Sequence, residues 1–301
     1  MELAVIFNTS ILPLFIIVAI AFVYNRICHP DISQITNLAI NVFGPIFIFS
    51  SVIKFNITLL SLIKPVIFMT LLTSIMIALA HLIARSIRAT EDERVSFILA
   101  CSMVNVGNFG LPLIYFAFGK NAEAYSILYF AAFSIPLSTV AIYISSKEIN
   151  FSKIMIDMAR IPIFHAMVIA LILSGMSINI PGPISKSLNL LSQATIPLLI
   201  FILGIQLSKM KFTMSHAKFI PLALGLRLII SPAVACLILA MISVTGLEKQ
   251  VAMIQTSTPS ALLPLMYAIR FNRSPDLLAA IILVSTVVSG ITLTLLIKTI
   301  S

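Results

Sequence analysis

The sequence contains no tryptophan, only three cysteines and few charged residues. Charged side chains make up 10% of its 301 residues, whereas soluble domains carry about 25%. Hydrophobic residues make up 60%. This composition excludes an ordinary soluble domain and is typical of a protein with many membrane-spanning helices.

The scarce polar residue types also exclude several functions. Cys28, Cys101 and Cys236 show neither a disulfide framework nor metal-ligand spacing, so we expect no metal and no cofactor. The net charge of +9 comes from bases scattered singly between apolar runs, which favours a topology signal over nucleic-acid binding. We expect membrane lipid as a partner and no nucleic acid.

Acidic residues are absent from the centres of the apolar runs. All ten lie in loops or at the ends of runs: Glu2, Asp31, Glu91, Asp92, Glu93, Glu123, Glu148, Asp157, Glu248 and Asp276. A cation transporter normally keeps an acid in its pathway, and an intramembrane aspartyl protease needs two. No H-E-x-x-H or G-x-S-x-G motif is present. We therefore expect a protein that is not an enzyme.

The apolar runs predict an all-α polytopic membrane protein with ten transmembrane helices. The predicted spans are 8–25, 33–53, 63–84, 95–118, 122–145, 162–178, 187–207, 217–243, 249–270 and 275–298. Twelve Lys and Arg residues then fall on one side of the membrane and six on the other, with Arg227 inside span eight. This bias predicts that both termini are extracytoplasmic and that segment 146–161 is cytosolic. We expect the protein to reside in the plasma (inner) membrane.

Two parts of the chain resemble each other at one fixed offset. Residues 110–115 (GLPLIY) and 262–267 (LLPLMY) share a Leu-Pro-Leu-x-Tyr pattern, and the tyrosines lie 152 residues apart. The same offset aligns 36–53 with 188–205, where 6 of 18 positions match. We therefore predict two five-span repeats, 1–145 and 162–301, joined by 146–161. Because five is odd, the second repeat would enter the membrane inverted.

Each repeat carries helix-weakening residues near the middle of one span. Span four reads N-V-G-N-F-G-L-P from 105 to 112, and span nine reads Q-T-S-T-P-S-A-L-L-P from 255 to 264. Glycine weakens a helix by its backbone entropy, and proline by its missing N–H group. A broken helix is tolerated at membrane depth only where it lines a cavity, and paired breaks point to a transporter's binding site.

The half-helices after these breaks would present their positive N-terminal ends to the membrane centre, which favours an anion. Proline kinks relieved by local Ser, Thr and Asn hydrogen bonds are the alternative interpretation. The predicted substrate-binding residues are Asn105, Gly107, Asn108, Gly110, Pro112, Gln255, Thr256, Ser257, Thr258, Ser260, Pro264 and Arg227.

Three basic residues have open roles at this stage. Arg227 lies about ten residues into span eight, where it either attracts the anion or extends its head group to the cytosolic surface. His81 and His165 lie near cytosolic span ends, where proton coupling and an ordinary interfacial position are the alternatives.

The motif N-x-G-N-x-G-L-P-L at 105–113 resembles span four of the auxin efflux carrier family, whose plant members are the PIN-formed proteins. Further matching segments are PDISQITN at 30–37, LRLIISPAV at 226–234 and SPD at 274–276. The resemblance extends over essentially the full length. It implies ten spans in two inverted repeats, a fold shared with bile-acid:sodium symporters, in which spans four and nine cross at their prolines around the substrate.

The resemblance also implies a scaffold part (spans one, two, six and seven), a moving transport part and a homodimer. Asn105 matches the family's substrate-contacting asparagine. Prokaryotic relatives move small organic anions such as malate and malonate, whereas plant members export indole-3-acetate. This chain lacks the long loop between spans five and six and the acid early in span three of some plant members, which suits a compact prokaryotic type.

Together these features predict a secondary transporter of a small organic carboxylate anion that works by alternating access. The alternatives are an anion channel, a Na⁺-coupled symporter that holds the ion by carbonyls and side-chain amides, and a membrane sensor or scaffold without transport.

Overall fold

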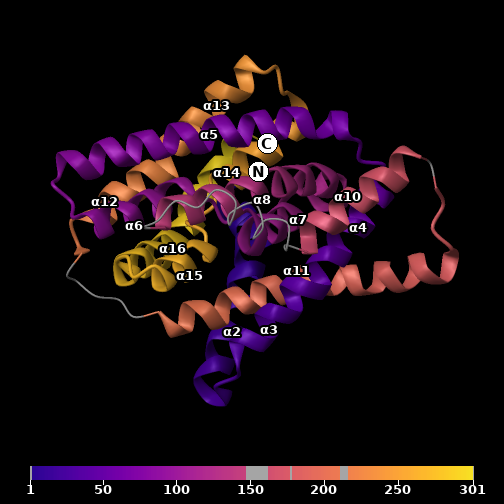
Figure 1. Cartoon of the computed structure of the whole chain (residues 1–301), viewed down its shortest axis with the longest axis horizontal. Helices are drawn as coiled ribbons and strands as arrows, with labels where there is room; N and C mark the ends of the chain where they lie inside the picture. Colours follow the sequence, from indigo (N-terminus) through magenta and orange to yellow (C-terminus); the bar gives the residue numbers. More distant parts are fainter. Residues whose placement is uncertain (1, 147–161, 177, 211–215, 301) are drawn as a thin grey trace.

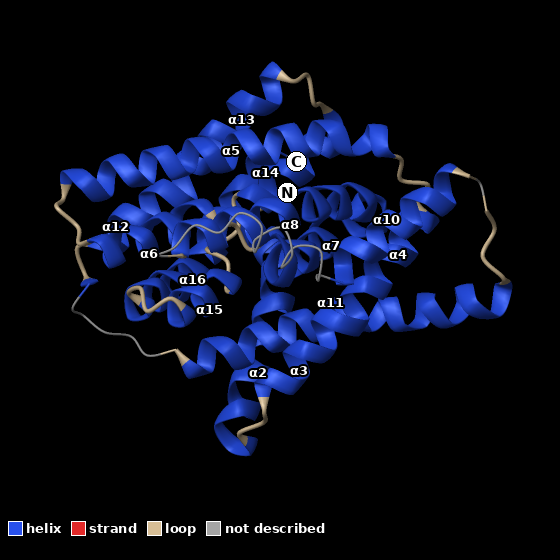
Figure 2. Ribbon diagram, viewed as in Figure 1, coloured by secondary structure: helices blue, strands red, loops and turns tan. Residues whose placement is uncertain are grey.

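Helices connected by loops make up the residues that the computed structural model describes, which are 2–146, 162–176, 178–210 and 216–300 (Figure 2). The predicted connecting segment, 146–161, lies outside these ranges except for Ser146. The helices, including short π-helical and 3₁₀ turns labelled η, are α1 (Leu3–Ile6), η1 (Phe7–Ile11), α2 (Leu12–Cys28), α3 (Ile32–Leu38), η2 (Ala39–Phe43), α4 (Gly44–Lys54), α5 (Leu59–Ser86), α6 (Glu91–Ser102), η3 (Val106–Gly110), α7 (Leu111–Phe118), η4 (Gly119–Ala122), α8 (Glu123–Ser145), α10 (Pro162–Gly175), α11 (Gly182–Lys209), α12 (Phe219–Leu224), η6 (Gly225–Ile230), α13 (Ser231–Met241), α14 (Gly246–Thr256), α15 (Leu263–Arg270) and α16 (Pro275–Ile300).

Seven helical stretches in the described ranges are long and apolar enough to cross a membrane, compared with the ten spans that the sequence predicts. They are Leu3–Cys28, Ile32–Lys54, Leu59–Ser86, Val106–Ser145, Gly182–Lys209, Phe219–Met241 and Pro275–Ile300. The difference arises because α6, α14 and α15 are interrupted pieces of 8 to 12 residues. In addition, α10 has 14 residues, and α7, η4 and α8 join into one stretch.

One group of helices consists of α2, α3–α4, α10 and α11. Helix α11 packs against α2 and α4, and α10 packs against α4. The contact between α2 and α11 depends on Gly204, because a Cβ atom there would lie 2.6 Å from the Cβ of Ala21 and closer still to the Val18 carbonyl. Only glycine therefore permits this close approach of the two backbones.

The second group contains the remaining long helices. Helix α5 packs against α6, α8 and α13, and α16 packs against α6, α12 and α15. In Figure 1, α5 and α11 run along opposite long edges of the molecule, with the interrupted helices between them. Helices α1 and α16 are in contact, and the two ends of the chain lie close together (Figure 1).

The outer faces of both groups are apolar. Ile27, Leu60, Ile229, Met241 and Ile291 each expose 66% or more of their surface. Contact of this apolar surface with water would cost much free energy, whereas lipid tails cover it without that cost. The exposed faces are therefore those of a membrane protein.

Candidate functional site

The first interruption separates α6 from α7. Helix α6 starts with a capping box, in which Thr90 and Glu93 each accept a hydrogen bond from the other's backbone N–H, and it ends at Ser102. Residues 103–105 are not helical, and the chain resumes through η3 into α7, whose second residue is Pro112. Because η3 runs directly into α7, Pro112 lies six residues after Val106, where the helix restarts.

The second interruption separates α14 from α15 in the same way. Helix α14 ends at Thr256, and α15 begins at Leu263 with Pro264 as its second residue. The intervening residues 257–262 form no regular helix and include Pro259, the other proline of this interruption.

The two interruptions cross and bond to each other. The Asn105 N–H donates to the Pro259 carbonyl over 3.0 Å, and the Ala261 N–H donates to the Met103 carbonyl over 2.8 Å. These bonds flank an isolated antiparallel pair, Val104 with Ser260. Each break thus satisfies backbone groups of the other, which lets two extended segments exist inside an apolar protein.

The crossing brings together four helix ends of two kinds. Helices α6 and α14 end there, and η3–α7 and α15 start there. The starts have no side-chain cap, since neither Asn105 at η3 nor Leu262 at α15 accepts a capping hydrogen bond. The first N–H groups of a helix have no partner within it, so both starts are free to bind an acceptor.

A cavity of about 310 Å³ lies against these two helix starts. Asn105, Gly107 and Asn108 line it from the first break, and Ala261 and Leu262 line it from the second. The other walls come from η2 and α4, α8, α10, α11 and α15: Ala39, Ile40, Gly44, Phe47, Phe130, Ser134, Leu137, Ile163, Phe164, Thr195, Leu199, Ile202, Gln206, Leu263, Met266 and Tyr267. No charged residue of the described chain lines it.

Two amide side chains at the cavity have unused hydrogen-bonding atoms. Asn105 is 5% exposed, and its Nδ2 has no partner; the Oε1 of Gln206 also has none. A buried donor without a partner is costly, which favours a ligand acceptor at Asn105. Sequence reasoning missed Gln206, although an amide near the end of an apolar run was a signal. It also missed the apolar walls, which come from helices distant in sequence.

The polar residues of the second interruption point elsewhere. Hydroxyl groups of Thr256, Ser257 and Thr258 donate to carbonyls of α14, and Ser260 donates to the Ala100 carbonyl over 2.7 Å. Gln255 donates to Ser126 on α8. These residues, together with Gly110, Pro112 and Pro264, lie at the crossing but do not line the cavity.

Arg227 lies fully buried in η6, on neither the cavity wall nor the protein surface. Its Nε donates to the Thr258 carbonyl over 2.9 Å, and its Nη1 to the Cys101 carbonyl over 3.4 Å and to the Ser231 hydroxyl over 3.0 Å. Its Nη2 donates to the Thr256 carbonyl. The guanidinium therefore binds the carbonyl ends of α6 and α14, which neither interpretation of this residue from sequence anticipated.

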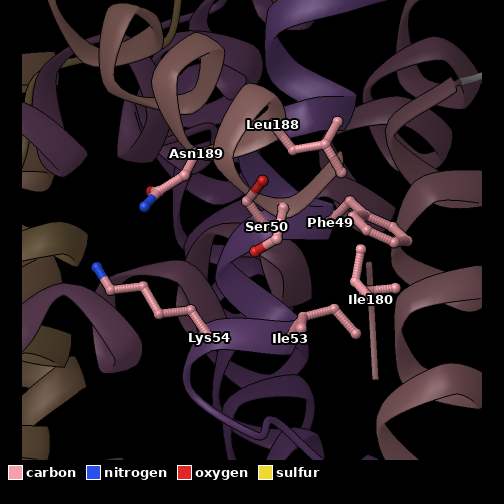
Figure 3. A pocket seen from close by; sticks show the side chains of 8 residues that line it. Phe49, Ser50, Ile53, Lys54, Ile180, Leu188 and Asn189 are labelled. Carbon is pink, nitrogen blue, oxygen red and sulfur yellow. The ribbon is translucent and has the colours of Figure 1, made fainter. Parts of the chain in front are cut away.

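A second, smaller cavity of about 190 Å³ lies between α4 and α11 (Figure 3). The polar ends of Lys54 and Asn189 point to the same side of it, but the Lys54 amine already pairs with Glu123 over 3.1 Å. Neither this cavity nor the larger one includes His81 or His165. The crossing is therefore the better candidate for a substrate site.

Comparison with known proteins identifies the family. A family model described as "Membrane transport protein" matches residues 6–152 and 147–297. The chain belongs to this family, the auxin efflux carrier family. Its members are transporters and not enzymes, and this chain is a multi-pass membrane protein.

Several proteins with known names are similar to this member of the auxin efflux carrier family. An uncharacterized transporter of Methanocaldococcus jannaschii is 32% identical over 222 residues, 70% of each chain. One of Methanothermobacter thermautotrophicus is 29% identical over 293 residues, 95% of each chain. Auxin efflux carrier component 1 of Arabidopsis thaliana is 26% identical over 108 residues, which cover 36% of this chain and 17% of the plant protein.

Proposed function

We propose that this protein is a secondary transporter of a small organic anion with one carboxylate, which binds where the two interrupted helices cross. The observation that carries the proposal is the cavity at two uncapped helix starts. Helix starts attract anions through free N–H groups and through the positive end of the helix dipole. The unpartnered Nδ2 of Asn105 supplies a further donor.

The walls of the cavity favour a substrate with an apolar body. Its volume of about 310 Å³ lies at the lower end of ligand pockets, which span about 300–1,000 Å³. Phe130, Ile163 and Met266 are among the apolar residues that line it. A second carboxylate would lose its hydration against such side chains, so a monocarboxylate fits better than a dicarboxylate.

The position of the cavity supports a mechanism of alternating access. One wall belongs to α4, α10 and α11, and the opposite wall to η3, α8 and α15. The first set packs closely within itself, and the two sets meet where η3 packs against α11 and α8 against α4. We propose that the first set, with α2, is the scaffold, that the second moves against it, and that two copies form a homodimer through the scaffold.

We also propose ten spans arranged as two inverted repeats. Helix boundaries support this arrangement: α7 and α15 begin at Leu111 and Leu263, and α8 and α16 begin at Glu123 and Pro275, each pair 152 residues apart. Because the offset matches the one between the sequence motifs, equivalent elements recur in both halves.

Orientation can be tested with a native cysteine. Cys28 is exposed at the end of α2, next to Arg26 on the side that the positive charges assign to the cytosol. In a variant with Cys101 and Cys236 replaced by alanine, a membrane-impermeant thiol reagent should label Cys28 only after permeabilisation. Labelling of intact cells would reverse the proposed topology.

Counterflow in proteoliposomes tests the transport proposal. Vesicles loaded with an unlabelled monocarboxylate should accumulate the labelled compound transiently, because a carrier exchanges substrate across the membrane. A channel would show no such trans-stimulation, and a sensor would show no uptake. A thermal-shift screen against mono- and dicarboxylates selects the compound, since a ligand stabilises the state that binds it.

A further inference from the structure

The two helices that end at the crossing bring negative charge to it. Helices α6 and α14 both end there, and each helix C-terminus carries about half a negative elementary charge. The two ends together amount to about one negative charge. In other transporters such half-helix ends and unwound carbonyls coordinate Na⁺ or H⁺, so the arrangement calls for one positive charge.

Arg227 supplies that charge from within the chain. Its three guanidinium nitrogens donate to carbonyls of Cys101, Thr256 and Thr258 and to the Ser231 hydroxyl. No described carboxylate forms an ion pair with it. The charge of this buried side chain is therefore balanced by helix ends and carbonyl dipoles alone, in the geometry expected around a bound cation.

The two helix starts on the opposite face of the crossing carry positive charge. The starts of η3–α7 and α15 face the cavity and together carry about one positive charge. Because Arg227 already matches the two negative ends, this positive charge is left for one substrate carboxylate. The unit of four helix ends plus Arg227 thus reaches neutrality when a single anionic group binds.

We propose that Arg227 is a tethered counter-cation of the crossing: its guanidinium occupies the place of a free monovalent cation between the two carbonyl ends and so positions the helix starts that bind the anion. It is a positioning residue, because it does not line the cavity. Two consequences follow. Uptake needs no Na⁺, and removal of the side chain leaves a carbonyl cage that accepts free guanidinium. The transport consequence rests on the function proposed above.

The first experiment uses the wild-type protein. Its melting temperature in detergent and its monocarboxylate uptake should be the same in NaCl and in choline chloride at constant ionic strength. A higher melting temperature in NaCl, or uptake that requires Na⁺, would overturn the proposal, since it would reveal a cation site that Arg227 does not fill. This measurement depends on no variant folding correctly.

The second experiment is chemical rescue of Arg227→Ala. Uptake by this variant should fall about 10- to 100-fold, the range typical of groups that orient ligand-binding atoms. Guanidinium chloride at low, non-denaturing concentration should raise its melting temperature and restore part of the uptake. Ile229→Ala is the matched control, because Ile229 lies two residues away with 68% of its surface exposed, and guanidinium should not stabilise it.

Two outcomes would contradict the rescue arm. One is a folded Arg227→Ala protein with wild-type uptake, and the other is a folded variant that guanidinium does not stabilise. Should Arg227→Ala not fold, Arg227→Lys takes its place: it keeps the charge, so it should fold and retain part of the uptake, and guanidinium should not stabilise it because the cage already holds one cation. The melting experiments need no transport assay, so a wild-type protein without counterflow would refute the carrier function while leaving the counter-cation testable.

Discussion

The two sides of the crossing differ in how their helix ends are satisfied. At the ends of α6 and α14, the guanidinium of Arg227 binds the carbonyl groups of Cys101, Thr256 and Thr258. At the starts of η3 and α15, no side chain caps the backbone N–H groups, and the Asn105 amide has a free donor. The same kind of backbone interruption is thus closed by the chain on one side and open to a ligand on the other.

This contrast separates residues that build the site from residues that we propose bind the substrate. Arg227 and Ser260 bond to carbonyls across the crossing, and the hydroxyl groups of Thr256, Ser257 and Thr258 donate to carbonyls of α14. Asn105 and Asn108 face the cavity with the helix starts. Substitutions on the closed side should therefore lower stability first, whereas those on the open side should lower affinity first.

The largest effect is expected for Arg227→Gln. A glutamine removes the charge and cannot reach three carbonyl groups, and breaking a buried charged network typically costs about 3–5 kcal/mol. We expect a strongly lowered melting temperature in detergent together with loss of uptake. Unchanged melting and transport in this variant would show that the closed side does not depend on the guanidinium.

Asn105→Ala should act on the open side with little effect on stability. A hydrogen bond to a charged group contributes about 1.5–3 kcal/mol, so substrate affinity should fall about 10- to 150-fold, as measured by thermal shift or isothermal titration. Asn108→Ala should weaken binding in the same direction. Asn189→Ala, an asparagine of the smaller cavity (Figure 3), serves as the control. Equal binding by Asn105→Ala and the control would place the substrate elsewhere.

Gly107→Ala should produce a moderate loss of affinity through the cavity wall. A Cβ atom at Gly107 would lie 2.9 Å from a ring carbon of Phe130, so the ring must shift within the cavity. Overpacking costs about 1–3 kcal/mol, and the low end of that range corresponds to about fivefold weaker binding. Gly110→Ala is the paired control, because its nearest contacts are 3.4 Å away. A stronger effect at Gly110 would contradict the geometry.

Ser231→Ala should have the smallest effect. It removes one neutral partner of Arg227 and leaves all three carbonyl bonds in place. A hydrogen bond to a charged group contributes about 1.5–3 kcal/mol, and because the carbonyl bonds remain we expect the low end of this range on a melting curve, with uptake at the wild-type level. A transport defect as large as that of Arg227→Gln would mean that the hydroxyl group itself takes part in the mechanism.

The membrane class and the two interruptions could be predicted from sequence because local composition determines them. Apolar runs indicate spans. Pro264 lies at the second position of α15, where the helix restarts, and Pro112 lies six residues after the restart at Val106. The described ranges contain seven long apolar helical stretches, fewer than the ten predicted spans, because the interrupted helices are too short to cross a membrane as single pieces. The ten-span, inverted arrangement stays a prediction.

The details of the site were harder to predict because they depend on tertiary contacts. The sequence shows that Thr256, Thr258 and Ser260 are polar and close to a break, but not that their hydroxyl protons go to carbonyl groups. It shows Arg227 in an apolar run, but not the carbonyls of two distant helices around it. The apolar walls from α8, α10 and α11 carry no motif that links them to the crossing.

The antiparallel pair of Val104 and Ser260 has a mechanical consequence. Two backbone hydrogen bonds beside this pair fasten the interrupted helices to each other. Under the proposed transport function, we infer that the four helical arms move as one unit that carries the anion at the crossing. Separating the two interrupted helices would leave those backbone N–H and carbonyl groups without partners in an apolar interior. A movement of the whole crossing against its neighbours therefore costs less free energy.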